Sequence, residues 1–472
     1  MKVYNTQTRQ KEELIPLEDG HFKVYVCGPT VYNYFHLGNA RPFITYDTFR
    51  RYLEYRGYKV SYVQNFTDID DKMIKRAAEE GITVRELADR FIAEYFQDAD
   101  ALGIKRATVH PRATDCIDEM LEMISILMDK EYAYVGEDGV YFDMSRFKEY
   151  GKLSHYNLDE LEAGASERVQ ADSGKRNQMD FALWKFRKPD EPYWASPWGD
   201  GRPGWHIECS AMIRKYLGET IDVHGGGQDL IFPHHENEIA QSEAANDKPF
   251  VKYWLHNGFI NVDYEKMSKS TGNFFTVRDL VSKFDYMVLR FFMLSGHYRM
   301  PINFSSDLLS AAQNGWERIK TCVGHLDFVA ASAPSKAADE QANQAQQDLR
   351  ASIQQFQDEF EQAMDDDLNT ADALAAVFEM VRAANTAAAV PGISASSLRE
   401  AAHKLREWLE VLGLNPENKQ ESIPEKVLSL VEERAQAKQA RDFAKADEIR
   451  QEIQNLGYQV ADTPQGPKVT PL

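Results

Sequence analysis

A strand–helix–strand pattern near the start of the chain restricts the fold to a small set. Residues 22–26 have the composition of a β-strand, residues 39–55 carry helical apolar spacing, and residues 59–63 form a second strand pattern. The helical pattern stops at Gly57. Elements in this order are typical of parallel strands joined by a right-handed crossover. We therefore predict an α/β domain that carries its ligands at the carboxyl ends of parallel strands.

The same periodicity returns after a long interruption. Helical patterns cover 208–217 and 233–245, and strand patterns cover 220–224 and 253–256. Between the two halves, residues 145–205 are irregular and rich in Trp, Pro and Gly, apart from a hairpin pattern just before them. We predict one doubly wound parallel sheet of Rossmann type that is interrupted by an insertion.

The remainder of the chain is predicted to be helical. The pattern is helical throughout beyond Phe304, and a polar linker precedes the last segment, which we expect to be helical to about Leu456 and to end in a short strand and a Pro/Gly-rich tail. The expected segments are the first half of the Rossmann domain (1–135), a connective insertion (136–204), the second half of the Rossmann domain (205–260), a lysine-rich loop region (261–310), a helical bundle (311–415) and a small C-terminal domain (416–472).

Composition places the protein in a broad class. Of its 472 residues 43% are hydrophobic, which is typical of a globular protein. No apolar run approaches the roughly 18 residues that a membrane helix needs, and residues 1–7 lack the apolar core of a secretory signal. Four widely spaced cysteines favour a reducing compartment over a disulfide framework. We expect a cytoplasmic protein with no membrane contact.

The charge balance restricts the choice of partners. The formal net charge is −20, from 54 basic and 74 acidic residues. This argues against indiscriminate polyanion binding, which depends on clustered Lys and Arg. A specific RNA partner stays open, because a local basic patch can lie on an acidic body.

The segment 36–39 (HLGN) lies where the first strand gives way to the first helix. The strand ending at Val26 places Cys27 at the sheet edge, and His36 and Asn39 stand at the start of the helix. Free N–H groups and a partial positive charge at a helix N-terminus suit a phosphate, and Gly38 lets a flat base approach the backbone. The alternative is a turn that carries an ordinary surface histidine.

A second segment, 266–270 (KMSKS), is a small cationic loop followed by Thr-Gly-Asn. Lys266 and Lys269 place two ammonium groups on a loop that can close on a departing pyrophosphate. A solvated basic loop is the alternative for this segment alone. The two segments together, in this order and within an α/β pattern, predict a site that handles a nucleotide's phosphates.

A glycine-rich segment follows the strand that ends at His224. Gly225, Gly226 and Gly227 are expected to form a turn, and Asp229 is a candidate acceptor for a ribose hydroxyl. The alternative is a flexible loop.

Four residues have the side chains of a zinc site. His234 and Glu238 are four positions apart in a helical pattern, so they share one face. With Cys27 and Cys209 they make a set of two sulfurs, one nitrogen and one oxygen, which suits zinc. The large sequence separations leave open the alternative of buried, apolar-like cysteines and a capped surface helix.

Further aromatic and histidine side chains can line a pocket beside such a metal. Trp205 and His206 precede Cys209, and His224 and His256 each end a predicted strand. Buried, hydrogen-bonded histidines and a packing tryptophan are an equally good interpretation of these residues.

Taken together, these motifs closely resemble the cysteinyl-tRNA synthetases, which are class I aminoacyl-tRNA synthetases. The resemblance covers the whole chain, and the combination of motifs is far more specific than any one of them. The matching stretches are 26–32, 36–41, 65–72, 201–212 (GRPGWHIECSAM), 232–238 (FPHHENE) and 266–273, with 447–450 and 462–466 near the end.

The resemblance implies that ATP, with Mg²⁺, and L-cysteine form cysteinyl-adenylate, and that the cysteinyl group then passes to the terminal ribose of tRNA(Cys). It makes 311–415 a tRNA-binding bundle, 416–472 an anticodon-binding domain and 261–310 a region that contacts the tRNA stem. We expect a monomer with one Zn²⁺ per subunit. By this resemblance, His36 and Asn39 stabilise the α-phosphate, Lys269 helped by Lys266 holds the β- and γ-phosphates, and Gly38 and Asp229 make further contacts with ATP. Zinc would be held by Cys27, Cys209, His234 and Glu238. The amino acid would be surrounded by Thr67, Trp205, His206, His224 and His256.

Zinc has a physical purpose in such a site. Serine fits the same cavity as cysteine, and shape alone discriminates by only ~1–3 kcal/mol. Zinc prefers a thiolate to a neutral hydroxyl. We therefore expect serine to be rejected without a separate editing domain.

Two other functions are compatible with parts of this pattern. A cysteine:sugar-amine ligase shares the catalytic core but is shorter and lacks both the full C-terminal RNA-binding part and the HHENE run, which are present here. A non-catalytic RNA-binding protein has no need of the intact segment 266–270 or of the ligand set. Cysteine-dependent ATP–pyrophosphate exchange and tRNA charging together separate the three.

Overall fold

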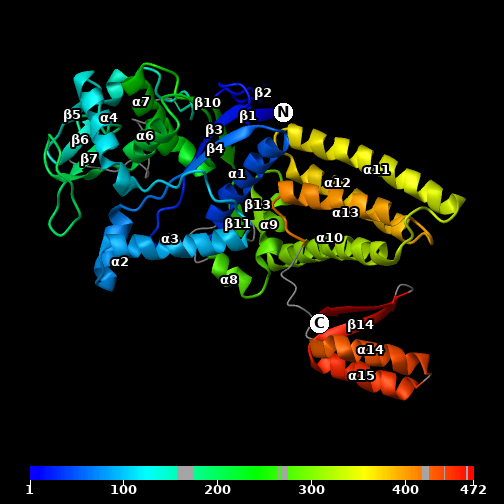
Figure 1. Ribbon diagram of the computed structural model, residues 1–472. Coiled ribbons are helices and arrows are strands. Elements are labelled where there is room, and N and C mark those ends of the chain that lie inside the picture. The colour runs from blue at the N-terminus through cyan, green and yellow to red at the C-terminus, as the bar shows by residue number, and fades with distance from the viewer. Residues whose placement is uncertain are drawn as a thin grey trace. The chain divides into compact units, whose positions relative to one another are not determined.

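The computed structural model divides into two compact units (Figure 1). Unit 1 comprises Met1–Trp316, Asp358–Ala376 and Glu410–Leu414, and unit 2 comprises Glu317–Gln357, Val377–Leu409 and Asn415–Leu472. The structure describes residues 1–156, 174–262, 265–266, 275–416, 425–440, 442–463 and 466–471.

Unit 1 is built on a four-stranded parallel sheet in the order β10-β9-β3-β4. The order confirms the predicted doubly wound α/β fold, because one crossover joins β3 to β4 and another joins β9 to β10. Its elements are β3 (His21–Val26), α1 (Leu37–Tyr55), β4 (Lys59–Gln64), α6 (Trp205–Tyr216), β9 (Ile221–Gly227), α7 (Glu236–Asn246) and β10 (Val251–Asn257).

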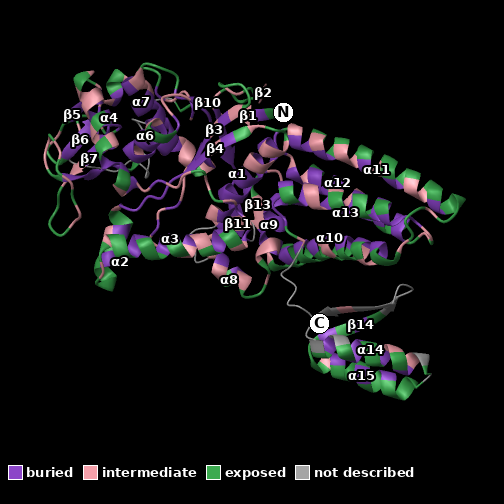
Figure 2. Cartoon of the chain, viewed as in Figure 1, coloured by how far each residue is buried: buried purple, intermediate pink, exposed green. Residues whose placement is uncertain are grey.

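The central strands are buried on both faces, which is typical of a parallel sheet covered by helices. Phe22, Val24 and Tyr25 of β3 are completely buried. In Figure 2 the sheet and the inner side of α1 are accordingly coloured as buried. The carboxyl ends of β3 and β9 lie side by side, since Val26 pairs with Gly225.

The glycine-rich segment differs from its predicted form. It continues β9 as a strand, with Gly225 opposite Leu255 and Gly226 opposite His256. A Cβ on Gly225 would lie 2.5 Å from the Tyr46 ring, and the Tyr46 hydroxyl donates to the Gly226 carbonyl at 3.1 Å. These glycines therefore admit a tyrosine from α1 against the sheet, so the predicted turn begins only after Gly227.

The insertion is more regular than the sequence indicates. Three of its strands join β5, which lies just before it, in an antiparallel sheet in the order β5-β6-β7-β8, and this sheet extends the predicted hairpin by two strands. Leu183 and Trp184 are neighbours on β7 and are both completely buried, so the alternation that marks a strand in a sequence is missing. The strands are β5 (Ala133–Val135), β6 (Gly139–Phe142), β7 (Phe181–Phe186) and β8 (Gly201–Pro203).

Smaller elements complete unit 1. The strands β1 (Lys2–Asn5) and β2 (Gln10–Glu13) form an N-terminal hairpin, and β11 (Ile260–Val262), β12 (Glu265–Lys266) and β13 (Ile302–Phe304) form a three-stranded sheet. The helices are α2 (Asp71–Glu80), α3 (Val84–Ala101), α4 (Ile117–Asp129), α8 (Val277–Val281) and α9 (Tyr286–Leu294), with short turns of helix at Ala113–Cys116, Met144–Arg146, Gln228–Leu230 and Ile231–His235.

Four long helices follow, as the helical pattern predicts. Within unit 2, Ile319, Leu326, Leu398 and Trp408 are completely or almost completely buried between them. The helices are α10 (Ser306–Ser332), α11 (Glu340–Asp365), α12 (Thr370–Ala388) and α13 (Ala395–Val411).

The C-terminal segment ends in a hairpin, where the sequence predicts a short strand and an irregular tail. After α14 (Glu425–Gln439) and α15 (Phe443–Asn455), β14 (Tyr458–Thr463) pairs with β15 (Gly466–Pro471). Val460 pairs with Val469, and both join the small core beneath the two helices. Long-range pairing thus orders a tail whose composition indicates none.

No helix in the parts of the chain that the structure describes is long and apolar enough to span a membrane.

Candidate metal centre and nucleotide site

Four predicted ligands lie together at the carboxyl end of the parallel sheet. The ligand atoms of Cys27, Cys209, His234 and Glu238 all lie within 4.8 Å of one another. The two sulfurs are 4.0 Å apart, and Nε2 of His234 lies 3.6 Å from Sγ of Cys209 and 3.0 Å from Oε1 of Glu238. Three regions far apart in the sequence thus contribute the ligands: Cys27 follows β3, Cys209 lies in α6, and His234 and Glu238 are four positions apart around the start of α7.

The separations fit a tetrahedral zinc ion. Zinc binds sulfur at ~2.3 Å and nitrogen or oxygen at ~2.0–2.2 Å, so the edges of such a tetrahedron measure about 3.3–3.8 Å. The distance from Sγ of Cys27 to Oε1 of Glu238 is 3.9 Å, and the three separations given above range from 3.0 to 4.0 Å. The donor set of two sulfurs, a nitrogen and a carboxylate oxygen is one that zinc prefers.

Buried charges in the set are coupled. Burial opposes ionisation of Glu238, but His224 and His234 lower the pKa of this carboxyl to about 2. Burial also opposes protonation of His234, whereas Glu238 and Cys209 raise its pKa to about 10. A hydrogen bond from Cys27 lowers the pKa of the Cys209 thiol to about 6, while burial raises the pKa of Cys27. These shifts favour the anionic forms of Glu238 and Cys209 and the protonated form of His234, so opposite charges lie together in a buried set.

Three predicted neighbours hold the ligands from behind. Nε2 of His224 lies 2.9 Å from Oε2 of Glu238. Nδ1 of His206 lies 3.0 Å from Nδ1 of His234, and the Trp205 ring stacks on the His234 ring with centroids 4.2 Å apart. Helix α6 begins at Trp205, earlier than predicted, so His206 and Cys209 are one turn apart on the same helix.

A histidine that the sequence analysis did not select extends this arrangement. Nε2 of His235 lies 3.4 Å from Sγ of Cys27, and its Nδ1 lies 2.8 Å from Nε2 of His256. Nδ1 of His256 lies 2.8 Å from the hydroxyl of Thr6. Burial lowers the pKa of His256 to about 3 and that of His235 well below its usual value, so both rings are neutral. In the sequence, the position of His235 as the second histidine of the HHENE run could have indicated this role.

His235 also belongs to an overlapping group of four possible ligands, in which His224 and His235 replace Cys209 and His234. Both groups share Cys27 and Glu238. The group with two sulfurs suits zinc better, because thiolate is its softer and more strongly bound ligand.

Thr67 is held by a buried carboxyl group. Its hydroxyl donates to Oε2 of Glu208 at 3.0 Å. Burial raises the pKa of Glu208 well above its usual value. Glu208 precedes Cys209 on α6, so it links the predicted amino-acid contact to the metal-binding helix; the sequence analysis did not select it.

A cavity of about 370 Å³ adjoins the ligand set. Five predicted site residues and one ligand line it, so the structure brings the nucleotide and metal predictions together. They are His36, Gly38, Asn39, Trp205, Asp229 and Cys27.

Backbone hydrogen bonds join the HLGN segment and the residue before it to the residues that follow the lysine loop. The backbone N–H of Leu37 donates to the carbonyl of Phe275 at 3.0 Å, and the N–H of Val277 donates to that of Phe35 at 3.2 Å. Lys266 ends β12, where its backbone pairs with Asn261. Lys269, with the rest of 267–274, lies outside the described residues.

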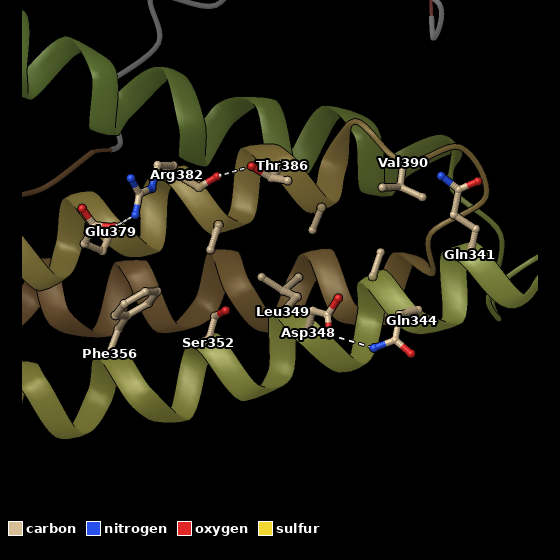
Figure 3. Close-up of a pocket in the computed structure, with 13 residues that line it drawn as sticks. Gln341, Gln344, Asp348, Leu349, Ser352, Phe356, Glu379, Arg382, Thr386 and Val390 are labelled. Carbon is tan, nitrogen blue, oxygen red and sulfur yellow. Dashed lines mark hydrogen bonds and ion pairs between the residues drawn. The ribbon is translucent and has the colours of Figure 1, made fainter.

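Two other hollows were found among the described residues. One, of about 540 Å³, shares Trp205 and Asp229 with the nucleotide cavity and is also lined by His206 and Glu208. The other, of about 520 Å³, lies in unit 2 between α11 and α12 (Figure 3). Asp348 and Glu379 line it beside Arg382, so it presents no net positive charge to a phosphate.

Comparison with known proteins agrees with this site. Residues 13–314 match the model of the class I (C) tRNA synthetase catalytic domain, and residues 359–415 match the DALR domain. The chain is similar to the cysteine–tRNA ligase of Caldicellulosiruptor saccharolyticus (55% identity) and to that of Clostridioides difficile (53% identity), in each case over 99% of both chains.

Solved structures show the same fold at low sequence identity. Methionyl-tRNA synthetase of Mycobacterium tuberculosis in complex with methionyl-adenylate has a TM-score of 0.61 at 17% identity, covering 87% of this chain and 94% of that one. The leucyl enzyme LeuRS of Agrobacterium radiobacter, in a ternary complex with tRNA, has a TM-score of 0.61 at 12% identity and 85% coverage of both chains. The chain therefore belongs to the cysteine–tRNA ligases, a family of class I aminoacyl-tRNA synthetases.

Proposed function

We propose that the protein activates L-cysteine with ATP and transfers the cysteinyl group to the terminal ribose of tRNA(Cys). The observation that carries this proposal is the position of Cys27, which both lines the nucleotide cavity and belongs to the four-ligand set. A thiol bound at that set would have its carboxylate within reach of a nucleotide in the cavity. The family to which the chain belongs supports the same reaction.

In the first step the cysteine carboxylate attacks the α-phosphate of ATP, which forms cysteinyl-adenylate and releases pyrophosphate. His36 and Asn39 lie at the N-terminal end of α1, where the partial positive charge of the helix end and the two side chains can stabilise the charge that develops on the α-phosphate. Gly38 and Asp229 would contact the base and the ribose. Lys266 and Lys269 would hold the β- and γ-phosphates together with Mg²⁺. In the second step a ribose hydroxyl attacks the adenylate carbonyl and releases AMP.

Selection of cysteine is assigned to the ligand set. Cys27, Cys209, His234 and Glu238 would hold one zinc ion, which when bound supplies a Lewis acid that prefers a thiolate to a hydroxyl. Trp205 and His206 pack on His234, and His224 orients Glu238. Thr67, held by Glu208, and His256, held by Thr6, complete the surroundings of the amino acid.

The roles of 261–310, 311–415 and 416–472 in contacting the tRNA stem, body and anticodon are part of this proposal. The cytoplasmic location and the monomeric state that we expect from the sequence stay predictions.

The decisive experiment combines bound-zinc analysis with two assays. We expect about one zinc per chain, cysteine-dependent ATP–pyrophosphate exchange without tRNA, and charging of tRNA(Cys). Exchange without charging would instead support the sugar-amine ligase, and absence of exchange would support a non-catalytic RNA-binding protein.

A further inference from the structure

Arg41 occupies an unusual position for a charged side chain. It lies in α1, two residues after Asn39, and only 1% of it is exposed. Its Nη1 donates to the carbonyls of Gly258 (3.0 Å) and Phe259 (2.6 Å). Its Nη2 donates to the carbonyls of His297 (3.2 Å) and Met300.

These acceptors are neutral backbone groups. Burial lowers the pKa of Arg41 to about 10, so the guanidinium stays charged at neutral pH. A buried cation paired with carbonyls alone carries a desolvation cost that a well-packed apolar residue would not. The rigid planar fork of arginine can, however, join several carbonyls in a fixed geometry, which lysine cannot do.

The carbonyls belong to two segments packed backbone against backbone. The N–H of Gly258 donates to the carbonyl of Tyr298 at 2.8 Å, and the N–H of Ile302 donates to that of Phe259 at 3.0 Å. A Cβ on Gly258 would lie 2.7 Å from the carbonyl oxygen of Arg299. Converging carbonyl dipoles repel one another, and the Arg41 cation offsets that repulsion.

One of the two segments is a wall of the nucleotide cavity. Residues 257–260 line that cavity together with His36, Gly38 and Asn39. The same segment leads directly into β11, which pairs with β12 and so with the backbone of Lys266. The first turns of α1 are therefore hydrogen-bonded to both sides of the lysine loop. Arg41 bonds to Phe259 before the loop, and the backbone of Leu37 bonds to Phe275 after it.

We propose that Arg41 is a positioning residue for ATP, which fixes the 257–260 wall of the nucleotide cavity against the helix that carries His36 and Asn39. The inference rests on the proposed activity, because Arg41 would align ATP for that reaction. Arg41 touches the wall only and is not a catalytic residue.

Arg290 provides a matched control. It is also completely buried, and it donates to the carbonyls of Leu412 (2.7 Å) and Leu102 (3.0 Å). It differs in pairing with Asp47 at 2.5 Å, and none of these partners lines the nucleotide cavity. Replacing either arginine removes comparable buried hydrogen bonds, but only Arg41 bonds to the cavity wall.

The test compares Arg41→Lys with Arg290→Lys in cysteine-dependent ATP–pyrophosphate exchange. For R41K we expect the KM for ATP to rise about tenfold or more and kcat to fall, with the KM for cysteine changed by less than about twofold. For R290K we expect a lower unfolding temperature with both KM values close to those of the parent protein. An unchanged KM for ATP in R41K, or an equal rise in R290K, would overturn the inference.

Two further measurements distinguish a failure of the proposed activity from a failure of the proposed role of Arg41. Calorimetric titration with ATP in the absence of cysteine reports nucleotide binding even if the parent protein shows no exchange, which would refute only the proposed activity. If R41K does not fold, Gly258→Ala perturbs the same wall from its other side, and it should also weaken ATP binding about tenfold. ATP binding unchanged by G258A would then refute the role of the wall.

Discussion

The imidazole of His224 is hydrogen-bonded to the carboxylate of Glu238, with Nε2 2.9 Å from Oε2, and both side chains are completely buried. The other oxygen of the same carboxylate, Oε1, faces His234 and Cys27. His224 thus fixes which oxygen is available to a metal. Such partners of metal ligands orient the ligand and increase its affinity.

We expect His224→Ala to weaken zinc binding about 10- to 100-fold, because Glu238 loses the group that orients it. Competition with a chelator would measure the affinity, and circular dichroism would verify that the variant is folded. His21→Ala is the control, because His21 contacts Glu18 at 3.2 Å outside the ligand set. An unchanged zinc affinity in H224A would contradict the role of His224 in orienting Glu238 as a ligand.

We expect Cys209→Ser to weaken cysteine binding far more than ATP binding, because it replaces a soft sulfur ligand and leaves the nucleotide cavity intact. Separate titrations with each substrate give the two affinities. Cys116→Ser is the control, since Cys116 is equally buried but lies outside the ligand set, and it should change neither. Equal weakening of both substrates in C209S would argue against a metal that selects the thiol.

His110 makes stability depend on pH. Its Nδ1 lies 3.0 Å from the Gln64 carbonyl, and its Nε2 accepts a hydrogen bond from the N–H of Ala107 at 3.0 Å. Protonation of Nε2 would therefore place its N–H against the N–H of Ala107, and this hydrogen bond would be lost. Burial lowers the pKa of this histidine to about 4. Because the usual value in an unfolded chain is about 6.5, the unfolded state binds more protons between these two pH values.

The contribution of His110 to stability is therefore complete above about pH 6.5 and declines as the pH falls toward 4, by up to about 3 kcal/mol. Urea unfolding of the parent protein and of His110→Gln, at several pH values from 7 to 4.5, isolates this effect from the titration of carboxylates. The difference in free energy of unfolding between them should shrink as the pH falls. A difference that stays constant would refute the prediction.

Asp367 is a buried junction between segments distant in sequence. Its carboxylate accepts from the N–H of Tyr4 (2.7 Å), the hydroxyl of Tyr298 (2.9 Å) and Nε of Arg299 (2.6 Å). We expect Asp367→Ala to reduce the free energy of unfolding by about 3 kcal/mol, because buried donors and a cation lose their acceptor. Asp367→Asn should cost less, since asparagine keeps an acceptor oxygen and tolerates the positive φ of 63°. Urea unfolding measures both; equal losses would show that the charge alone matters.

The sequence predicts the parallel sheet because its signals are local. The strand and helix patterns around Val26 and Gly57 each need only a few neighbouring residues to be recognised. The same topology places Cys27 at the carboxyl end of β3, because parallel strands bring their carboxyl ends to one edge. It does not place Cys209, His234 and Glu238, which lie on helical segments. Their individual roles remain proposals, and Lys269 lies outside the described residues.

The features that sequence patterns missed depend on distant partners. Gly225 lies so close to the Tyr46 ring that no Cβ would fit, and no local pattern indicates that contact. Thr6 meets His256 across 250 positions, and the strands of the insertion show no alternation because both faces of β7 are partly covered. Such contacts exist only in the folded chain.

The order of strands has a consequence for synthesis of the protein. The central strand β3 pairs with β4 early, but its other neighbour, β9, belongs to a much later part of the chain, and Cys27 is separated from Glu238 by 211 positions. A growing chain on the ribosome therefore carries β3 with one unpaired edge while about 150 further residues are made, which is a hazard for aggregation. The four ligands can meet only after Glu238 has emerged. With zinc held by these four residues, as we propose, its uptake would be a late event of folding, and metal content would report whether a chain has closed its sheet.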